Sequence, residues 1–96
     1  MTYSDLISYS IILEVTPDGE SHVRNRTAWA SITPARTVGI MDDLWRRTGN
    51  RIEQRVGRIG GERLHRFIEP NTGERCRMDD SGCPATEAWV PTTRPA

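Results

Sequence analysis

The two cysteines and two histidines are the residues of this chain best suited to hold a metal or attack a substrate. Cys76 and Cys83 are separated by six residues, and His22 and His65 lie far apart in the sequence. A zinc site needs four such ligands, commonly with cysteine pairs two to four residues apart. The spacing therefore does not support a metal site. It leaves open whether the cysteines form a disulfide or remain free thiols.

Other polar clusters do not match a catalytic pattern. Asp42 and Asp43 are neighbours in a segment with helical periodicity, so their side chains diverge and do not share a site. The run from Asp79 to Gly82 lacks the alternating oxygen ligands of a calcium loop. The chain also has no phosphate-binding loop and no hydrolase motif. We therefore expect a protein that is not an enzyme and that uses no metal or cofactor.

Arginines form the most distinctive charged segment. Residues 44–66 hold seven arginines and two glutamates, whereas residues 1–20 hold four acidic residues and no basic ones. Exposed arginines can contact carboxylates of a protein partner or phosphates of a nucleic acid. They can also be solvated, or pair with the acidic residues of the same chain. If there is a partner-binding surface, we predict that its charged residues are Arg46, Arg47, Arg51, Arg55 and Arg58, with Trp89 as its apolar residue.

A glycine motif inside this segment raises the nucleic-acid alternative. Gly57-Arg58-Ile59-Gly60 resembles the G-x-x-G loop by which KH domains clamp a nucleic-acid backbone. KH domains place an aliphatic residue three positions after the second glycine, where this chain has Arg63. The net charge of zero is also unlike that of a general nucleic-acid binder. Because of these two differences, a nucleic-acid-binding module is the second hypothesis, after a protein-binding one.

Two strands and a helix are expected in the N-terminal half, and they would position the arginines. Apolar residues alternate from Ile7 to Val15, which predicts a strand with one buried face. Pro17-Asp18-Gly19-Glu20 predicts a tight turn, and a second strand should cover about 21–32, although Asn25 interrupts its alternation. Together they predict an N-terminal β-hairpin.

The segment 35–48 has the pattern of an amphipathic helix. Thr33 followed by Pro34 can begin it, and Gly49 can end it. Its apolar residues recur at helical spacing, and Trp45 falls on the same face. Trp45 is therefore a predicted core residue. Trp29 is one as well, because it shares a face of the second predicted strand with Val23 and Thr27.

The remaining segments carry weaker signals. Residues 50–61 fit either a helix or a strand, because the spacing of their apolar residues is compatible with both. Residues 62–69 predict a third strand that ends at Pro70-Asn71-Thr72-Gly73. Hydrophobicity then falls, so we expect an irregular cysteine-containing loop and a flexible tail over 73–96.

These elements predict one α+β domain with ββαβ order over residues 1–72. A chain of 96 residues accommodates one domain. Exposed edges of a three-stranded sheet would permit a homodimer. No apolar run approaches the roughly 20 residues that cross a bilayer, and the segment Met1 to Asp5 lacks a basic signal-peptide region. We expect a cytoplasmic protein without membrane contact.

The chain resembles a group of small proteins of uncharacterised function from phages and prophages of high-GC actinobacteria. The resemblance covers residues 7–71 and consists of the Pro17-Asp18-Gly19 turn, a helix initiated by threonine, and a late strand ending in Glu69-Pro70-Asn71. It implies a ββαβ topology and a bacterial host cytoplasm, and it assigns no functional residues. The resulting hypothesis is a small non-catalytic protein that binds a host or phage protein, or another copy of itself.

Overall fold

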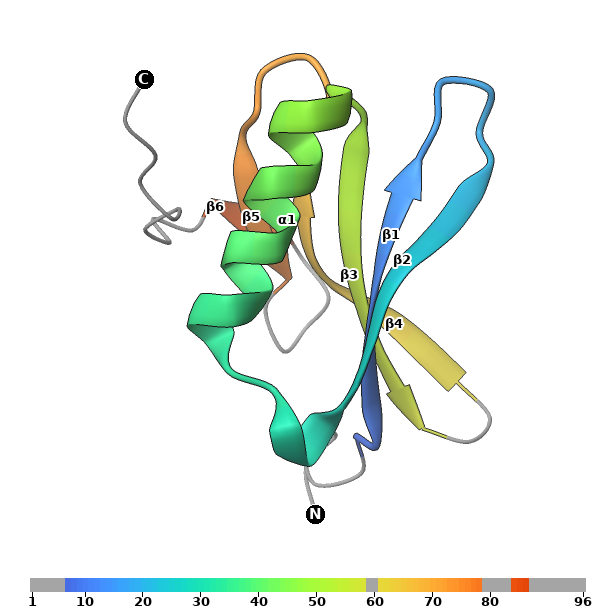
Figure 1. Ribbon diagram of the computed structural model, residues 1–96, viewed down its shortest axis with the longest axis vertical. Helices are drawn as coiled ribbons and strands as arrows, with labels where there is room; N and C mark the ends of the chain where they lie inside the picture. The colour runs from blue at the N-terminus through green and yellow to red at the C-terminus, as the bar shows by residue number, and fades with distance from the viewer. Residues whose placement is uncertain (1–6, 59–60, 79–83, 87–96) are drawn as a thin grey trace.

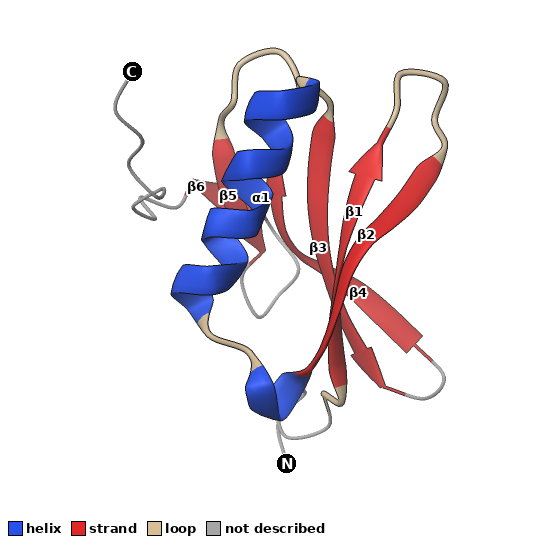
Figure 2. Cartoon of the chain, viewed as in Figure 1, coloured by secondary structure: helices blue, strands red, loops and turns tan. Residues whose placement is uncertain are grey.

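One α-helix packs against one face of an antiparallel β-sheet (Figure 1). The computed structural model describes residues 7–58, 61–78 and 84–86. Within these residues the sheet has six strands in the order β2-β1-β3-β4-β5-β6. Figure 2 shows the helix on one side of this sheet. The elements are β1 (Tyr9–Val15), β2 (Ser21–Ala28), the 3₁₀ turn η2 (Trp29–Ser31), α1 (Pro34–Thr48), β3 (Arg51–Arg58), β4 (Gly61–Ile68), β5 (Arg75–Met78) and β6 (Pro84–Thr86).

The α+β class and the N-terminal hairpin are confirmed. β1 and β2 pair antiparallel, and the Thr16 amide donates to the Glu20 carbonyl over 2.9 Å to close the turn. Gly19 has a φ of 89°, which an L side chain rarely adopts. The Asp18 carboxylate accepts hydrogen bonds from the Thr16 hydroxyl and the Glu20 amide. The turn therefore forms through the local interactions that its residue types favour.

The predicted helix is also confirmed, as α1. Pro34 occupies its first turn, where a missing amide hydrogen costs nothing. Gly49 ends it with a φ of 70°, and its amide donates to the Trp45 carbonyl over 2.7 Å. No helix among the described residues is long and apolar enough to cross a membrane.

The ββαβ order is wrong, because four strands follow the helix. Residues 50–61, which the sequence left undecided, contain β3, and β3 lies between β1 and β4 in the middle of the sheet. The segment 73–96, predicted to be irregular, contains β5 and β6. Ile52 and Val56 are both fully buried, and their spacing fits a helix and one face of a strand equally well. Pairing with β1 and β4 is the tertiary interaction that makes this segment a strand.

The helix packs on the face of β1 opposite to the predicted one. Ile12, not the alternating set of Ile11 and Leu13, joins Met41, Leu44, Ile52 and Ile68 in the hydrophobic core. Ile11 and Leu13 are also buried, at 5% and 7% exposure, but on the other face. β1 lies between β2 and β3, and the partners of Ile11 are the long side chains of Arg26 and Arg55. Aliphatic stems of arginine shield apolar surface, so a central strand can be buried on both faces.

The KH interpretation of the glycine motif is wrong. A KH loop connects two helices, whereas Gly57 lies in β3 and the next element is the strand β4. A Cβ at Gly57 would lie 2.5 Å from the Gly61 carbonyl oxygen and 2.8 Å from the Tyr9 hydroxyl. Gly57 therefore permits the close approach of β3 and β4, which is a structural role. Gly60 lies outside the described residues.

Candidate functional site

The predicted partner-binding arginines do not form one surface. Arg46 and Arg47 lie near the end of α1, on the helix side of the sheet. Arg51 and Arg55 alternate with Ile52 and therefore point to the opposite face. Arg58 ends β3, and its side chain is outside the described part of the chain, as is Trp89. The arginine segment is thus divided between two faces.

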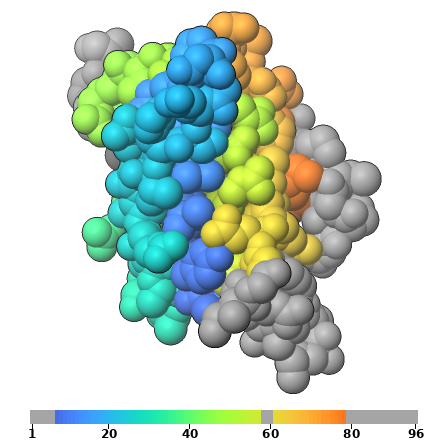
Figure 3. Space-filling model, turned by 90° about the vertical axis from the view of Figure 1, so that its right-hand side faces the viewer, coloured from blue at the N-terminus to red at the C-terminus, as the bar shows by residue number. Residues whose placement is uncertain are grey.

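Arg51 and Arg55 are held by ion pairs on the sheet face opposite the helix. Figure 3 shows this face, with β2, β1, β3 and β4 side by side. Glu53, 8% exposed, accepts from Arg51 Nε over 2.7 Å and from Arg55 Nε over 3.0 Å. Arg51 also pairs with Glu69 over 3.2 Å and lies 4.4 Å from the ring centroid of Phe67. These contacts give both arginines a structural role.

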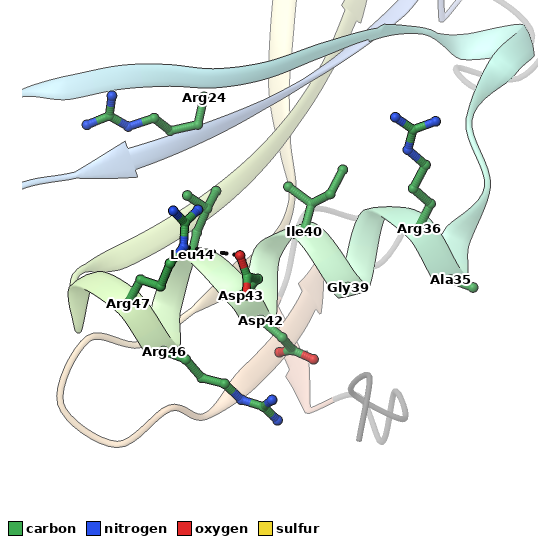
Figure 4. Close-up of a pocket in the computed structure, with 10 residues that line it drawn as sticks. All are labelled: Arg24, Ala35, Arg36, Gly39, Ile40, Asp42, Asp43, Leu44, Arg46 and Arg47. Atoms are coloured by element: carbon green, nitrogen blue, oxygen red, sulfur yellow. Dashed lines mark ion pairs between the residues drawn. The ribbon is translucent and has the colours of Figure 1, made fainter. Parts of the chain in front are cut away.

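A basic groove of about 450 Å³ lies beside the helix (Figure 4). Four arginines line it from two elements, and Ile40 and Leu44 contribute apolar surface between them. In Figure 4, Arg36, Ile40 and Arg47 project toward β2, whereas Asp42 and Arg46 project to the other side of the helix. The lining residues are Arg24, Ala35, Arg36, Gly39, Ile40, Asp42, Asp43, Leu44, Arg46 and Arg47.

A β-bulge places Arg24 at this groove. Ile12 pairs with Asn25 and Leu13 with Val23, so Arg24 is an extra residue in β2. Its side chain reaches Glu14 on the helix face, and Nε and one terminal nitrogen donate to Glu14 Oε1 over 3.0 and 2.8 Å. Arg47 is held in a similar way by Asp43, with a 3.1 Å separation between Nε and Oδ2. Both guanidinium groups are therefore oriented by carboxylates.

Arg24 and Arg36 lie outside the arginine-rich segment 44–66 and were not predicted from the sequence. The interruption of alternation at Asn25 was the one signal of the bulge. Arg36 is exposed in the first turn of α1, and the spacing of Arg36, Ile40 and Arg47 puts all three on one side of the helix. Of the predicted residues whose side chains the structure describes, only Arg46 and Arg47 line the groove.

Glu14 is the buried carboxylate that supports the groove. It is 6% exposed and accepts from Asn50 Nδ2 over 2.6 Å as well as from Arg24. The hydrogen bond from Asn50, followed by those from Arg24, lowers the pKa of Glu14 below its ordinary value of 4.5. Glu14 therefore links β1 to the bulge in β2 and to the residue that precedes β3.

Glu14→Gln should make the free energy of unfolding depend less on pH in the acidic range. The folded pKa is lowered, so the ionised Glu14 contributes stability above pH 4.5, and this contribution is lost as the pH falls through the folded pKa. Urea unfolding midpoints should be lower for the variant at neutral pH, and the difference should shrink below pH 4.5. Glu20→Gln, at an exposed turn residue, controls for the loss of one charge. A difference that persists unchanged at low pH would contradict the assignment.

The remaining candidate residues are separated by the fold. His22 is on β2 and His65 on β4, with two strands between them. Cys76 is a free thiol, buried on β5, and burial, together with nearby Glu74, raises its pKa. Cys83 lies outside the described residues. Within residues 7–58, 61–78 and 84–86, no three His, Cys, Asp or Glu side chains are grouped as metal ligands.

The two predicted core tryptophans are half-buried. Trp45 packs against the core cluster, and its indole Nε1 donates to the Pro70 carbonyl over 3.3 Å. Gly73, with a φ of 70°, approaches the Trp45 ring so closely that an added Cβ would lie 2.8 Å from it. Trp29 packs edge-on against His65, with ring centroids 6.1 Å apart. Trp45 thus attaches the segment between β4 and β5 to the helix.

Comparisons with known proteins do not assign the chain to a family. No family model, no curated protein and no solved structure matches it.

Proposed function

We propose that this protein is a small non-catalytic binding protein that recognises an acidic segment of a partner protein at the basic groove. The observation that carries the proposal is the arrangement of Arg24 on β2 with Arg36 and Arg47 on the facing side of α1, around apolar surface from Ile40 and Leu44. Arginine forks suit carboxylates, and apolar surface between them suits a peptide that alternates acidic and apolar side chains. Charge complementarity would steer such a partner to the groove.

The groove lies beside β2, where a further strand could also pair. β2 is the terminal strand on this side of the described sheet. A peptide strand can add to such an edge, but the bulge at Arg24 limits regular pairing there. The strand β2 contains Arg24 and Arg26 and no acidic residue, so pairing two β2 strands would bring like charges together. An acidic partner is therefore favoured over the edge-to-edge homodimer.

A protein partner also fits the local charge better than a nucleic acid does. Asp43 lies within the groove and pairs with Arg47, so the surface is not uniformly basic. The chain as a whole has equal numbers of acidic and basic residues, 13 of each. The phage or prophage setting and the host cytoplasm belong to this proposal, supported by the resemblance over residues 7–71.

The proposal is tested with a short fluorescent peptide that alternates glutamate and leucine. We expect the wild type to bind it, and Arg36→Glu to weaken binding by roughly tenfold or more, which corresponds to about 1.4 kcal/mol. Arg26→Glu is the matched control, because Arg26 is an exposed arginine that alternation places on the opposite sheet face. A glutamine and leucine peptide should bind neither form. Thermal unfolding of each variant verifies that it is folded.

Three outcomes would overturn the proposal. Equal loss of binding in Arg36→Glu and Arg26→Glu would show that net charge, not the groove, determines affinity. Binding of the glutamine peptide with the same affinity would remove the role of the arginines. Tighter binding of single-stranded DNA, with a steep decrease on adding salt, would support the nucleic-acid alternative.

A further inference from the structure

A second cavity, of about 220 Å³, lies between the start of α1 and the strands β3 and β4. One side of it is apolar and consists of Trp29, Ile32 and Pro34. The other side carries the polar side chains of Thr37, Gln54, His65 and Arg66. The cavity shares no residue with the basic groove, so it is a separate site.

Three of these four polar side chains are bonded within the protein. The Thr37 hydroxyl donates to the Thr33 carbonyl over 3.0 Å. Gln54 has no exposed surface, and its Nε2 donates to Ser10 Oγ over 3.1 Å. Its Oε1 accepts from a terminal nitrogen of Arg66, also over 3.1 Å, and Arg66 makes a further interaction besides this one. These bonds fix the polar side of the cavity, and recognition of a ligand has to come from another group.

His65 is the fourth polar side chain, and a second β-bulge accounts for its place at the cavity. Its neighbours Leu64 and Arg66 pair with consecutive residues of β3, so His65 is an extra residue of β4. The imidazole packs edge-on against Trp29, with an interplanar angle of 89°. Within the described part of the chain the ring makes no hydrogen bond. Its nitrogens are therefore available to a ligand.

The His65 ring is uncharged at neutral pH. Burial, and then the charges of Arg66, Arg63 and Arg77, lower its pKa to about 4. A neutral imidazole has one nitrogen that donates and one that accepts a hydrogen bond. The arginines that disfavour the imidazolium also disfavour a cationic ligand beside it. The cavity thus offers a hydrogen-bond acceptor to a ligand that carries a donor and no positive charge.

We propose that this cavity binds a small neutral phenol, whose hydroxyl donates to His65 and whose ring contacts Trp29, Ile32 and Pro34. An apolar cavity of roughly 150 Å³ is enough for benzene, so about 220 Å³ holds one ring with its hydroxyl. The volume is below the roughly 300–1,000 Å³ of sites for drug-sized ligands. A carboxylate is disfavoured, because it would lose its hydration while Arg66 is already engaged.

Phenol is the probe, and toluene, with a methyl group in place of the hydroxyl, tests the hydrogen bond. In an NMR titration of the full chain, phenol should shift the Trp29 indole and His65 ring resonances in a saturable way. His65→Phe keeps a ring but removes the acceptor, so it should lower the ratio of phenol affinity to toluene affinity by about fivefold or more. Using this ratio cancels the different hydrophobicity of the two probes. His22→Phe is the matched control, because His22 lies on β2 and does not line the cavity, and it should leave the ratio unchanged.

Several results would overturn the proposal. An unchanged ratio in His65→Phe would mean that His65 does not receive the hydroxyl, and tighter binding of benzoate than of phenol would make the cavity an anion site. Tighter binding of N-acetyltyrosinamide than of phenol would assign the cavity to a tyrosine side chain of a partner instead of a free phenol. Shifts confined to residues away from Trp29 and His65, or no shifts, would exclude the site. If His65→Phe is unfolded by circular dichroism, Ile32→Trp provides the second test, since filling the apolar side should abolish phenol binding, and retained binding would contradict the proposal.

Discussion

Asp42→Ala is expected to lower the free energy of unfolding by about 3 kcal/mol, the low end of the range for breaking a buried ion pair. Asp42 is 1% exposed, and its Oδ1 accepts from Arg75 Nε over 2.7 Å, which joins α1 to β5. Removing the carboxylate leaves the Arg75 guanidinium, 22% exposed, without this partner. The low end applies because water reaches part of Arg75. Urea unfolding followed by circular dichroism measures the effect.

Asp43→Ala is the matched control, one residue further along the helix. Asp43 pairs with Arg47, and their side chains are 31% and 65% exposed. Exposed pairs contribute about 0–1 kcal/mol, so this variant should be nearly as stable as the wild type. A cost for Asp42→Ala no greater than that for Asp43→Ala would mean that the pair does not attach β5 to the helix.

The net contribution of the Asp42–Arg75 pair to the free energy of unfolding can also be tested. Oδ2 of Asp42 is buried and has no hydrogen-bond partner among the described residues, where the carboxylate is bonded through Oδ1. Replacing both residues with apolar ones of similar size, Asp42→Leu with Arg75→Met, should recover much of the stability lost in Asp42→Ala. Failure of the double variant to recover would indicate that the pair contributes more than the cost of burying it.

Ile12→Ala is expected to cost about 3 kcal/mol, within the roughly 2–5 kcal/mol measured for truncating buried aliphatic residues. Ile12 is 1% exposed on a central strand and belongs to the cluster with Met41, Leu44, Ile52 and Ile68. The cost combines the lost burial of the side chain with the cavity left under the helix. The measurement is the free energy of unfolding in urea.

Val23→Ala serves as the control for Ile12→Ala, because Val23 lies on the neighbouring strand at 56% exposure. We expect it to change stability by less than about 0.5 kcal/mol, as for most surface positions. The comparison also tests which face of β1 the helix covers. If Ile12→Ala were as mild as Val23→Ala, the helix would have to lie on the other face of the sheet.

Local patterns were sufficient for the elements whose signals are contained within a few residues. The turn at Pro17 to Glu20 forms through backbone and side-chain bonds within the five residues from Thr16 to Glu20. The helix begins and ends at the predicted Thr33 and Gly49 boundaries. The α+β class followed from these two elements. Turn and capping preferences depend on neighbouring residues, so no distant contact was needed to predict them.

Strand identity in the second half required distant partners. β3 has Ile52 and Val56 at a spacing common to helix and strand, and it becomes a strand because β1 and β4 pair with both of its edges. β5 and β6 are only four and three residues long, so their own sequence carries little signal. Their hydrogen bonds to neighbouring strands supply the missing stabilisation.

The sequence by itself determined the hairpin, the helix and the concentration of arginine. The tertiary structure decided which arginines share a surface. The bulge in β2 directs Arg24 toward the helix side, and strand alternation directs Arg51 and Arg55 away from it. The direction of a side chain on a sheet depends on register, and register depends on pairing between segments far apart in the chain. That dependence is why the arginines predicted as one surface are divided between two faces, and why the groove could be recognised only in the folded protein.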